Sequence, residues 1–370
     1  MKDPRTMQQR RLAKLASVCK TRMLAKSTLP PPRKGNAELS KCVPHFRTPW
    51  RLVEARRCDA RRVNEFIGAG GWDYFDVPGA DRLAAYATAF PFVEVNATFY
   101  MWPDPPSATA WRKRVPAGFQ FAIRTHRELT HLHRLRATPG ARSSLARTAK
   151  LAKRLRAIAI VAETPASVVP DAREFTDLLA TVDLPCPVAL EARHFRDREL
   201  PAPLAAAMED NDVADAVDFS RQSSRTESTL AYGRLFGLGD GNRWEFTTDE
   251  LAVIRERGDT MGASRVAYAF HGVRMYKDAG RFLTYIRTGK APPATRHRGL
   301  RSLEEVLSAD ARFPAGRGDL IREHGFRVVD GLEGGESHAR DLLLDLPAGP
   351  FRSATEVAQR LTNEALARAR

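Results

Sequence analysis

Eight short runs of apolar, β-branched or aromatic residues recur between residues 63 and 290, and helix-like segments separate them. This alternation is typical of a parallel sheet whose strands are buried on both faces. Eight repeats within roughly 230 residues match a closed barrel better than an open doubly wound sheet. The sequence therefore predicts an α/β fold, a TIM-type (β/α)₈ barrel. The predicted strands are residues 65–69, 92–99, 119–124, 157–162, 187–191, 213–217, 231–236 and 266–270, and the predicted helices include residues 80–89, 144–156, 171–182, 201–210 and 248–261.

The positive charge of the chain is concentrated in its first 62 residues. The formal net charge is +15, but residues 1–62 hold 17 Lys/Arg against 4 Asp/Glu, whereas the other 308 residues hold 42 against 40. This composition predicts a basic, disordered leader. Three interpretations of it stay open: a tail or over-long start, a segment that contacts nucleic acid nonspecifically, and a targeting segment.

The cysteines and the hydropathy pattern favour a cytoplasmic protein. Cys19, Cys42, Cys58 and Cys186 show neither metal-binding spacing nor the density of a disulfide framework. No stretch approaches the roughly 20 apolar residues of a membrane-spanning helix. We therefore expect no membrane contact.

The pattern changes after residue 290. Residues 291–301 are rich in Pro and Arg and indicate a linker. Residues 302–370 predict a small helical domain with helices at 302–307, 317–324, 337–346 and 353–366, the last beginning with capping-box spacing at Ser353. Because this domain lacks a catalytic-looking cluster, we expect it to pack or to bind a protein partner.

Polar and charged residues recur at or just after the ends of the predicted strands, where barrels build their functional face. We expect them to converge at one mouth. The proposed catalytic residues are Glu94, Glu191, His131 and Asp218, and the proposed substrate-binding residues are Asn96, Tyr100, Arg124, Glu163, Arg193, His194, Arg234, His271 and Asp278.

Two of these carboxylates have competing interpretations. Strand alternation over residues 92–99 would place Glu94, Asn96 and Thr98 on one face, so Glu94 is either an acid/base group or part of a structural hydrogen-bond pair. Glu191 and Arg193 form either an internal ion pair or an acid/base group beside an anion-binding arginine.

The cofactor prediction is a divalent metal ion or none. The sequence has no Gly-x-Gly-x-x-Gly, Walker or Gly-x-Ser-x-Gly motif, which argues against a nucleotide cofactor and a serine hydrolase. His126, His131 and His133 are spaced five and two apart, unlike helical metal ligands at i and i+4. Glu163, Glu191, Asp218 and His271 nevertheless supply enough donors to leave a divalent ion open.

Several segments resemble the YecE-like family, the domain of unknown function numbered 72 (DUF72). They include residues 71–75, 93–100, 190–194 and 232–237. The resemblance covers about residues 63 to 290 and implies a TIM-type barrel. The family usually has Lys where Arg124 stands and His where Phe236 stands, and neither replacement performs the same proton chemistry. Residues 313–314 and 344–353 are similar to a second small helical family, numbered 2795 (DUF2795).

These observations lead to two functional hypotheses. The first is an enzyme acting on an anionic substrate, such as a phosphorylated sugar or a nucleic-acid fragment, in one version by metal-dependent hydrolysis. The second is a noncatalytic ligand-binding or scaffold protein that recruits partners through its C-terminal helices and basic leader. The fold alone does not decide between them.

Overall fold

A computed structural model describes residues 63–259, 262–331 and 334–368 of the chain, and these described residues belong to one compact unit. The leader predicted for residues 1–62, with Cys19, Cys42 and Cys58, lies outside the described residues. No helix of the described part is both long and apolar enough to cross a membrane.

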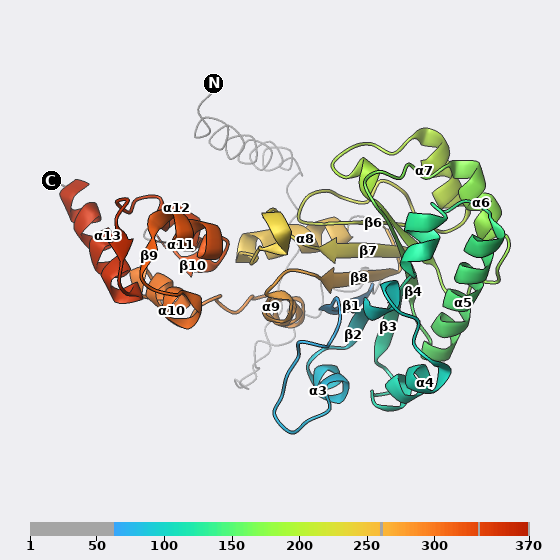
Figure 1. Cartoon of the computed structure of the whole chain (residues 1–370), viewed down its shortest axis with the longest axis horizontal. Helices are drawn as coiled ribbons and strands as arrows, with labels where there is room; N and C mark the ends of the chain where they lie inside the picture. The colour runs from blue at the N-terminus through green and yellow to red at the C-terminus, as the bar shows by residue number, and fades with distance from the viewer. Residues whose placement is uncertain (1–62, 260–261, 332–333, 369–370) are drawn as a thin grey trace, which may run out of the picture. The chain divides into compact units, whose positions relative to one another are not determined.

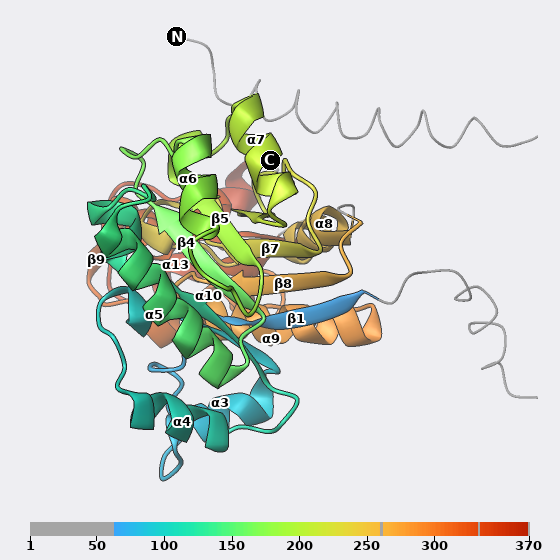
Figure 2. The ribbon, with the colours of Figure 1, turned by 90° about the vertical axis from the view of Figure 1, so that its right-hand side faces the viewer.

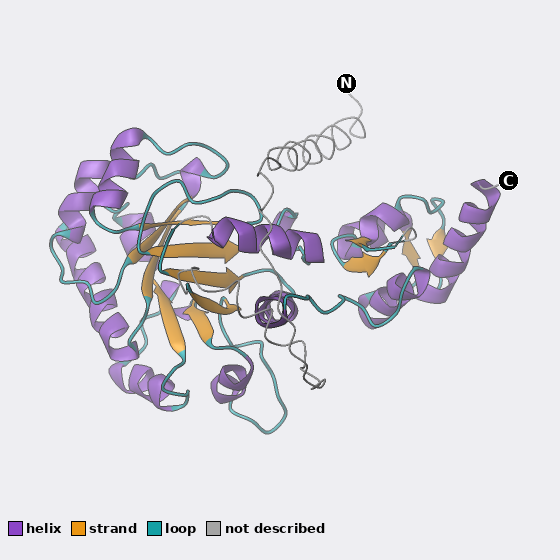
Figure 3. Cartoon of the chain, turned by 180° about the vertical axis from the view of Figure 1, so that it is seen from behind, coloured by secondary structure: helices purple, strands orange, loops and turns teal. Residues whose placement is uncertain are grey.

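Eight parallel strands close into a barrel in chain order, and helices surround them (Figures 1 and 3). The last strand pairs with the first along its full length, from Asn64 beside Arg265 to Ala69 beside Phe270. The predicted barrel is therefore confirmed, and each predicted run overlaps a strand. The strands are β1 (Asn64–Ala69), β2 (Phe92–Val95), β3 (Gln120–Arg124), β4 (Ala159–Thr164), β5 (Val188–Ala192), β6 (Ala214–Val217), β7 (Leu230–Leu235) and β8 (Arg265–Phe270).

Four helices of the barrel, α3 to α6, begin where the sequence supplies a capping side chain. Asp81, Asp104, Thr138 and Asp171 each accept a hydrogen bond from a backbone N–H of the helix that follows them. The helices α3 to α7 lie on the outer side of the strands (Figure 2). The barrel helices are α3 (Arg82–Ala89), α4 (Pro105–Lys113), α5 (Pro139–Leu155), α6 (Ala172–Leu179), α7 (Ala202–Asp210), α8 (Thr248–Asp259) and α9 (Met275–Thr288).

The second strand is shorter than the sequence predicted. β2 ends at Val95, and a 3₁₀ turn (Ala97–Phe99) follows it. The Thr98 hydroxyl donates to the backbone carbonyl of Val95 at 2.8 Å and lies 2.6 Å from that of Arg124, which fixes the turn. The expectation that strand alternation places Glu94, Asn96 and Thr98 on one face is therefore wrong beyond Glu94.

Strand alternation sorts the remaining strand residues between two apolar layers. One cluster includes Phe92, Ala122, Val161, Ala189 and Tyr232, each two residues before a charged residue of the same strand. The alternate positions belong to the larger cluster that the helices cover. Because side chains two apart share a face, the same alternation gathers those charged residues, Glu94, Arg124, Glu163, Glu191 and Arg234, above the apolar interior at the carboxyl ends of the strands.

The C-terminal segment has its own apolar core, which includes Leu303, Leu307, Leu343 and Val357. Helices α10 (Leu300–Asp310), α11 (Arg317–His324), α12 (Ala339–Leu343) and α13 (Ala354–Arg368) match the predicted helices. The sequence did not predict two small antiparallel sheets, because strands of two or three residues show no alternation. They pair β9 (Ala315–Gly316) with β12 (Pro350–Phe351) and β10 (Val328–Asp330) with β11 (Glu336–His338).

Two glutamates join this segment to the barrel. Glu245, just before α8, accepts a hydrogen bond from the Val328 backbone at 2.9 Å and pairs with Arg327. Glu336 pairs with Arg281 of α9 and accepts a hydrogen bond from the Thr248 backbone at 2.7 Å. These carboxylates stabilise the contact because each satisfies several donors at once.

Candidate functional site

Arg234 of β7 is the centre of the charged cluster at the mouth of the barrel. Its side chain is 1% exposed. It donates to Glu94 through Nη2 at 2.8 Å and Nε at 3.2 Å, to Glu163 through Nη1 at 2.6 Å, and also to Glu191. Glu94 further accepts from the Tyr232 hydroxyl at 2.9 Å. Arg234 thus uses four donor contacts to hold together three strands that are far apart in sequence.

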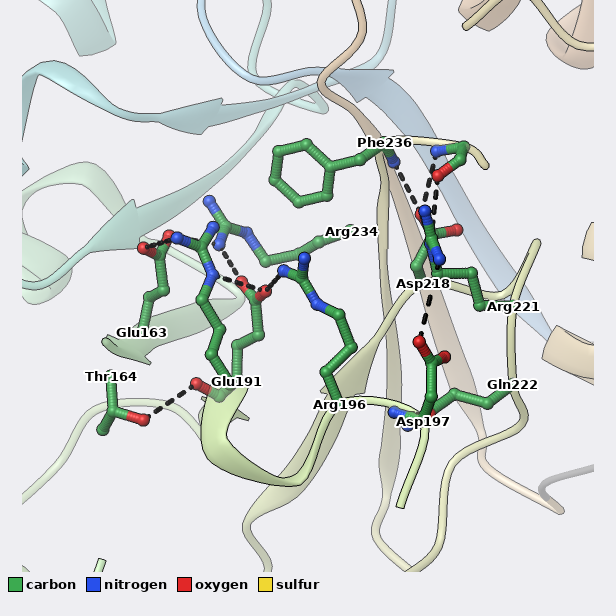
Figure 4. Close-up of polar contacts among 12 residues, drawn as sticks. Glu163, Thr164, Glu191, Arg196, Asp197, Asp218, Arg221, Gln222, Arg234 and Phe236 are labelled. Carbon is green, nitrogen blue, oxygen red and sulfur yellow. Dashed lines mark hydrogen bonds and ion pairs between the residues drawn. The ribbon is translucent and has the colours of Figure 1, made fainter. Parts of the chain in front are cut away.

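Three further guanidinium groups contact Glu163 and Glu191, and Figure 4 shows Arg196 and Arg234 beside Glu191. Glu163 pairs with Arg124 and with Arg193, each at 2.6 Å. Glu191 pairs with Arg193 at 2.9 Å and with Arg196 at 3.0 Å. Four arginines, counting Arg234, therefore face three glutamates, and the cluster carries a net charge of +1.

The ion pairs keep two of these carboxyl groups charged. Burial by itself raises the pKa of Glu94, but the charge of Arg234 and the hydrogen bonds from His271 and Arg234 outweigh it and hold the pKa well below its usual range. For Glu191 burial also opposes ionisation, but Arg234 and Arg193 lower the pKa to about 2. A carboxyl group that is ionised at neutral pH does not donate a proton, so these contacts favour the ion-pair interpretation of Glu94 and Glu191 over an acid role.

His271, just after β8, is neutral at pH 7. Burial lowers its pKa, and nearby Glu94 compensates only in part. Asn96 donates one amide hydrogen to Gly70 O at 2.8 Å, and its Nδ2 lies 3.3 Å from Nδ1 of His271. A neutral imidazole that accepts at Nδ1 carries its proton on Nε2, which faces Glu94 at 3.4 Å.

A cavity of about 700 Å³ opens above this cluster. A second cavity of about 210 Å³ adjoins it and shares Arg193, Phe236, Gly241 and Asn242 with it. Of the predicted site residues, Asn96, Tyr100, Arg124, Glu163, Arg193, Arg234 and His271 line the larger cavity, and Glu191, Arg193 and Asp218 line the smaller one.

Two buried polar atoms of residues that line the larger cavity have no hydrogen-bond partner within the described part of the chain. They are Nε of Arg124 and Oδ1 of Asn96. Buried polar groups are nearly always satisfied in folded proteins, so these two atoms depart from the usual pattern.

Three predicted site residues, His131, His194 and Asp218, make contacts that do not point to a ligand. His131 packs its ring against Phe99 at 5.1 Å and lines neither cavity. Nδ1 of His194 lies 2.9 Å from the backbone oxygen of Ala166, and His194 also lines neither cavity. Asp218 accepts hydrogen bonds from the Phe236 and Gly237 backbones, both at 2.9 Å, so it shapes the β7 loop.

Asp278 is the clearest correction among the predicted substrate-binding residues. It is fully buried in α9, where it accepts a hydrogen bond from the Phe246 backbone, and it lines neither cavity. Burial, and then the nearby charge of Glu245, raise its pKa well above the usual range. Asp278 therefore belongs to the packing of α9 and not to the mouth.

The donors at the mouth do not form a metal site. In the described ranges no group of three or more His, Cys, Asp or Glu side chains is arranged to hold an ion. Glu94, Glu163 and Glu191 each accept from guanidinium groups instead. We therefore derive no chemical step through a metal.

Several residues of the cavity and of the ion-pair network were not among the predicted site residues. Tyr74, Phe236 and Tyr276 line it, and Arg196 and Tyr232 complete the ion-pair network. Tyr232 and Arg234 are two residues apart in one strand, so strand alternation could have predicted that both side chains point into the barrel. Tyr74 and Tyr276 lie in loop and helix positions for which no sequence pattern indicates a direction.

The fold and the mouth together define a TIM-type barrel protein with an arginine-rich cavity at the carboxyl ends of its strands. The chain belongs to the family described as "Protein of unknown function DUF72", which matches residues 66–296. Among curated proteins, the UPF0759 protein YunF of Bacillus subtilis (strain 168) is 31% identical over 71 residues, 18% of this chain and 25% of that protein.

Two solved structures of DUF72 family proteins are similar to this chain. The one from Enterococcus faecalis V583 is 15% identical, with a TM-score of 0.48, and the match covers 62% of this chain and 99% of that one. The one from Thermotoga maritima MSB8 is 16% identical, with a TM-score of 0.47, and covers 60% and 99%.

Proposed function

We propose that the mouth of the barrel binds a small ligand through one anionic group, such as the phosphate of a phosphorylated sugar. The observation that carries this proposal is the arginine-rich lining of the larger cavity, to which Arg124, Arg193 and Arg234 contribute. Guanidinium groups are the side chains best suited to bind phosphate and carboxylate groups.

The charge balance supports the same ligand class. Four arginines against three carboxylates leave one positive charge in excess, and a phosphate or carboxylate group would neutralise it. Arg234 lines the cavity, but its donors are already used by three glutamates, so it positions those carboxylates and does not bind the ligand. The donors available to a ligand therefore come from Arg124 and Arg193.

A catalytic version of this proposal needs a proton-transfer group other than Glu94 and Glu191. His271 favours it, because its imidazole is neutral at pH 7, lies in the cavity wall and faces a carboxylate. In this version the barrel is an enzyme acting on an anionic substrate, and His271 accepts or donates the proton.

The other predictions concern the two ends of the chain. We carry forward as proposals that residues 302–370, which resemble the DUF2795 family, bind a protein partner, and that residues 1–62 contact nucleic acid nonspecifically. Binding to a polyanion that weakens steeply with salt, and that is lost when residues 1–60 are deleted, would support the second proposal.

The anion site is tested by isothermal titration of the full chain with ribose 5-phosphate and with inorganic phosphate. Arg124→Ala removes a charge-assisted contact of about 1.5–3 kcal/mol, so we expect affinity to fall roughly ten- to a hundredfold. Arg173→Ala is the control, because that arginine is 92% exposed on α6. If the wild type binds neither probe, or if Arg124→Ala binds as the wild type does, the anion site is refuted.

A further inference from the structure

We propose that the ligand carries a planar aromatic ring beside its anionic group, as a nucleoside monophosphate does. This inference rests on the proposed anion site and adds a second recognition element to it. It is carried by an aromatic wall, formed by Tyr74, Tyr100, Phe236 and Tyr276, that lines the same cavity as Arg124 and Arg193.

Two members of the aromatic wall are held in place. The ring of Phe236 stacks on His271, with centroids 4.8 Å apart and an interplanar angle of 21°. Tyr276 packs edge-on against Phe75 at 5.1 Å, and its hydroxyl donates to Gly71 O at 3.3 Å. These contacts give the cavity fixed aromatic surface before any ligand binds.

The other two members are exposed to solvent. Tyr74 is 85% exposed and Tyr100 is 67% exposed, although both line a cavity. Exposed aromatic surface around a polar pocket is typical of a binding site. A planar ring placed against these tyrosines would remove that surface from water.

Exposed apolar side chains are concentrated at this end of the barrel. Of the eleven large apolar side chains that are exposed in the described ranges, eight lie in loops that follow barrel strands, among them Tyr74, Tyr100, Met101, Leu132, Leu238 and Val273. The described loops at the opposite end contribute none. The mouth therefore exposes more apolar side chains than the rest of the described barrel surface, and packing of the core does not account for them.

The arginines of the cavity lie close to aromatic side chains, so one small ligand could contact both. The Arg124 guanidinium lies 3.6 Å from the ring centroid of Phe99, and that centroid lies 4.9 Å from the ring centroid of Tyr100. The guanidinium groups of Arg193 and Arg234 lie 5.8 and 5.4 Å from the ring of Phe236. An anionic group at Arg124 would thus place an attached ring beside aromatic side chains.

The volume of the cavity and its remaining polar atoms fit this class of ligand. About 700 Å³ lies within the range of pockets that hold ligands with a ring system, and it exceeds what a lone phosphate occupies. Asn96, a residue with both donor and acceptor capacity, also lines the cavity. A ring, a sugar and one phosphate would use each of these features.

The test compares adenosine and uridine 5′-monophosphates with ribose 5-phosphate by titration of the full chain. Stacking of a base on an aromatic side chain contributes about 1–3 kcal/mol. We therefore expect at least one nucleotide to bind about tenfold or more tightly than ribose 5-phosphate. The double variant Tyr74→Ala/Tyr100→Ala should remove that preference, so that the nucleotides and ribose 5-phosphate bind it with similar affinity.

The control is Tyr74→Phe/Tyr100→Phe, which keeps both rings and should keep the preference. Equal affinity of the wild type for the nucleotides and ribose 5-phosphate would overturn this inference and leave the anion site standing. A preference that survives the double alanine variant would overturn it as well. Failure of every probe to bind the wild type would instead overturn the proposed function, and this inference with it.

Discussion

Replacement of Arg234 by methionine should destabilise the barrel strongly, because it leaves one buried carboxylate without a strong partner. Glu163 would keep Arg124 and Arg193, each at 2.6 Å, and Glu191 would keep two arginines. Glu94, which is 0% exposed, would keep only the Tyr232 hydroxyl and the neutral His271. Removal of one partner of a buried ion pair costs about 3–5 kcal/mol, and we expect that loss at pH 7.5.

The pH dependence of this loss has a definite sign. In the wild type the pKa of Glu94 is depressed, so its contribution to stability is present above its ordinary value of 4.5 and is lost as the pH falls through the folded value. Without Arg234, burial becomes the dominant influence and raises that pKa above 4.5. The folded variant then binds a proton that the unfolded chain does not, so its deficit should shrink between pH 7.5 and pH 5.

Urea unfolding followed by tryptophan fluorescence measures this deficit, with wild type and variant compared at each pH so that other titrating groups cancel. The double variant Glu94→Gln/Arg234→Met removes the orphaned charge and should recover part of the stability at pH 7.5. The reasoning fails if Arg234→Met stays within 1 kcal/mol of the wild type, or if its deficit grows on acidification.

Two further predictions concern contacts away from the mouth. Glu336→Ala should lower the free energy of unfolding by about 2–4 kcal/mol, because it removes the carboxylate partner of Arg281, whose side chain is only 5% exposed. The control Glu323→Ala removes one partner of an exposed ion pair and should cost under about 1 kcal/mol. Equal losses of stability in the two variants would contradict this prediction. Asp278→Asn should stabilise the protein at pH 7.5, because burial and Glu245 raise the pKa of Asp278, so the folded state holds a proton that the unfolded state releases. The gain should vanish toward pH 4, and urea titrations that show no gain at pH 7.5 would argue against a protonated Asp278.

The sequence predicted the interior charges of the barrel better than its loops. Glu163, Glu191 and Arg234 each lie within a strand, where a period of two and the strand end fix both the face and the height of the side chain. Asn96 and His194 lie in 3₁₀ turns or their caps, and Asp278 lies in a helix, where no such period applies. The sequence also did not predict which charged residues form ion pairs across the barrel, because partners such as Glu94 and Arg234 are 140 residues apart.

By itself the sequence determined the strand count, the barrel and the end at which polar residues gather, because these follow from local hydrophobic period and from the direction of parallel strands. Only the tertiary structure decided what the gathered groups do. Burial and the choice of ionic partner set the protonation of Glu94 and Glu191, and both carboxylates contact Arg234 only because the barrel closes. The same closure left Arg124 with an unused donor and two tyrosines in solvent, which no local pattern encodes.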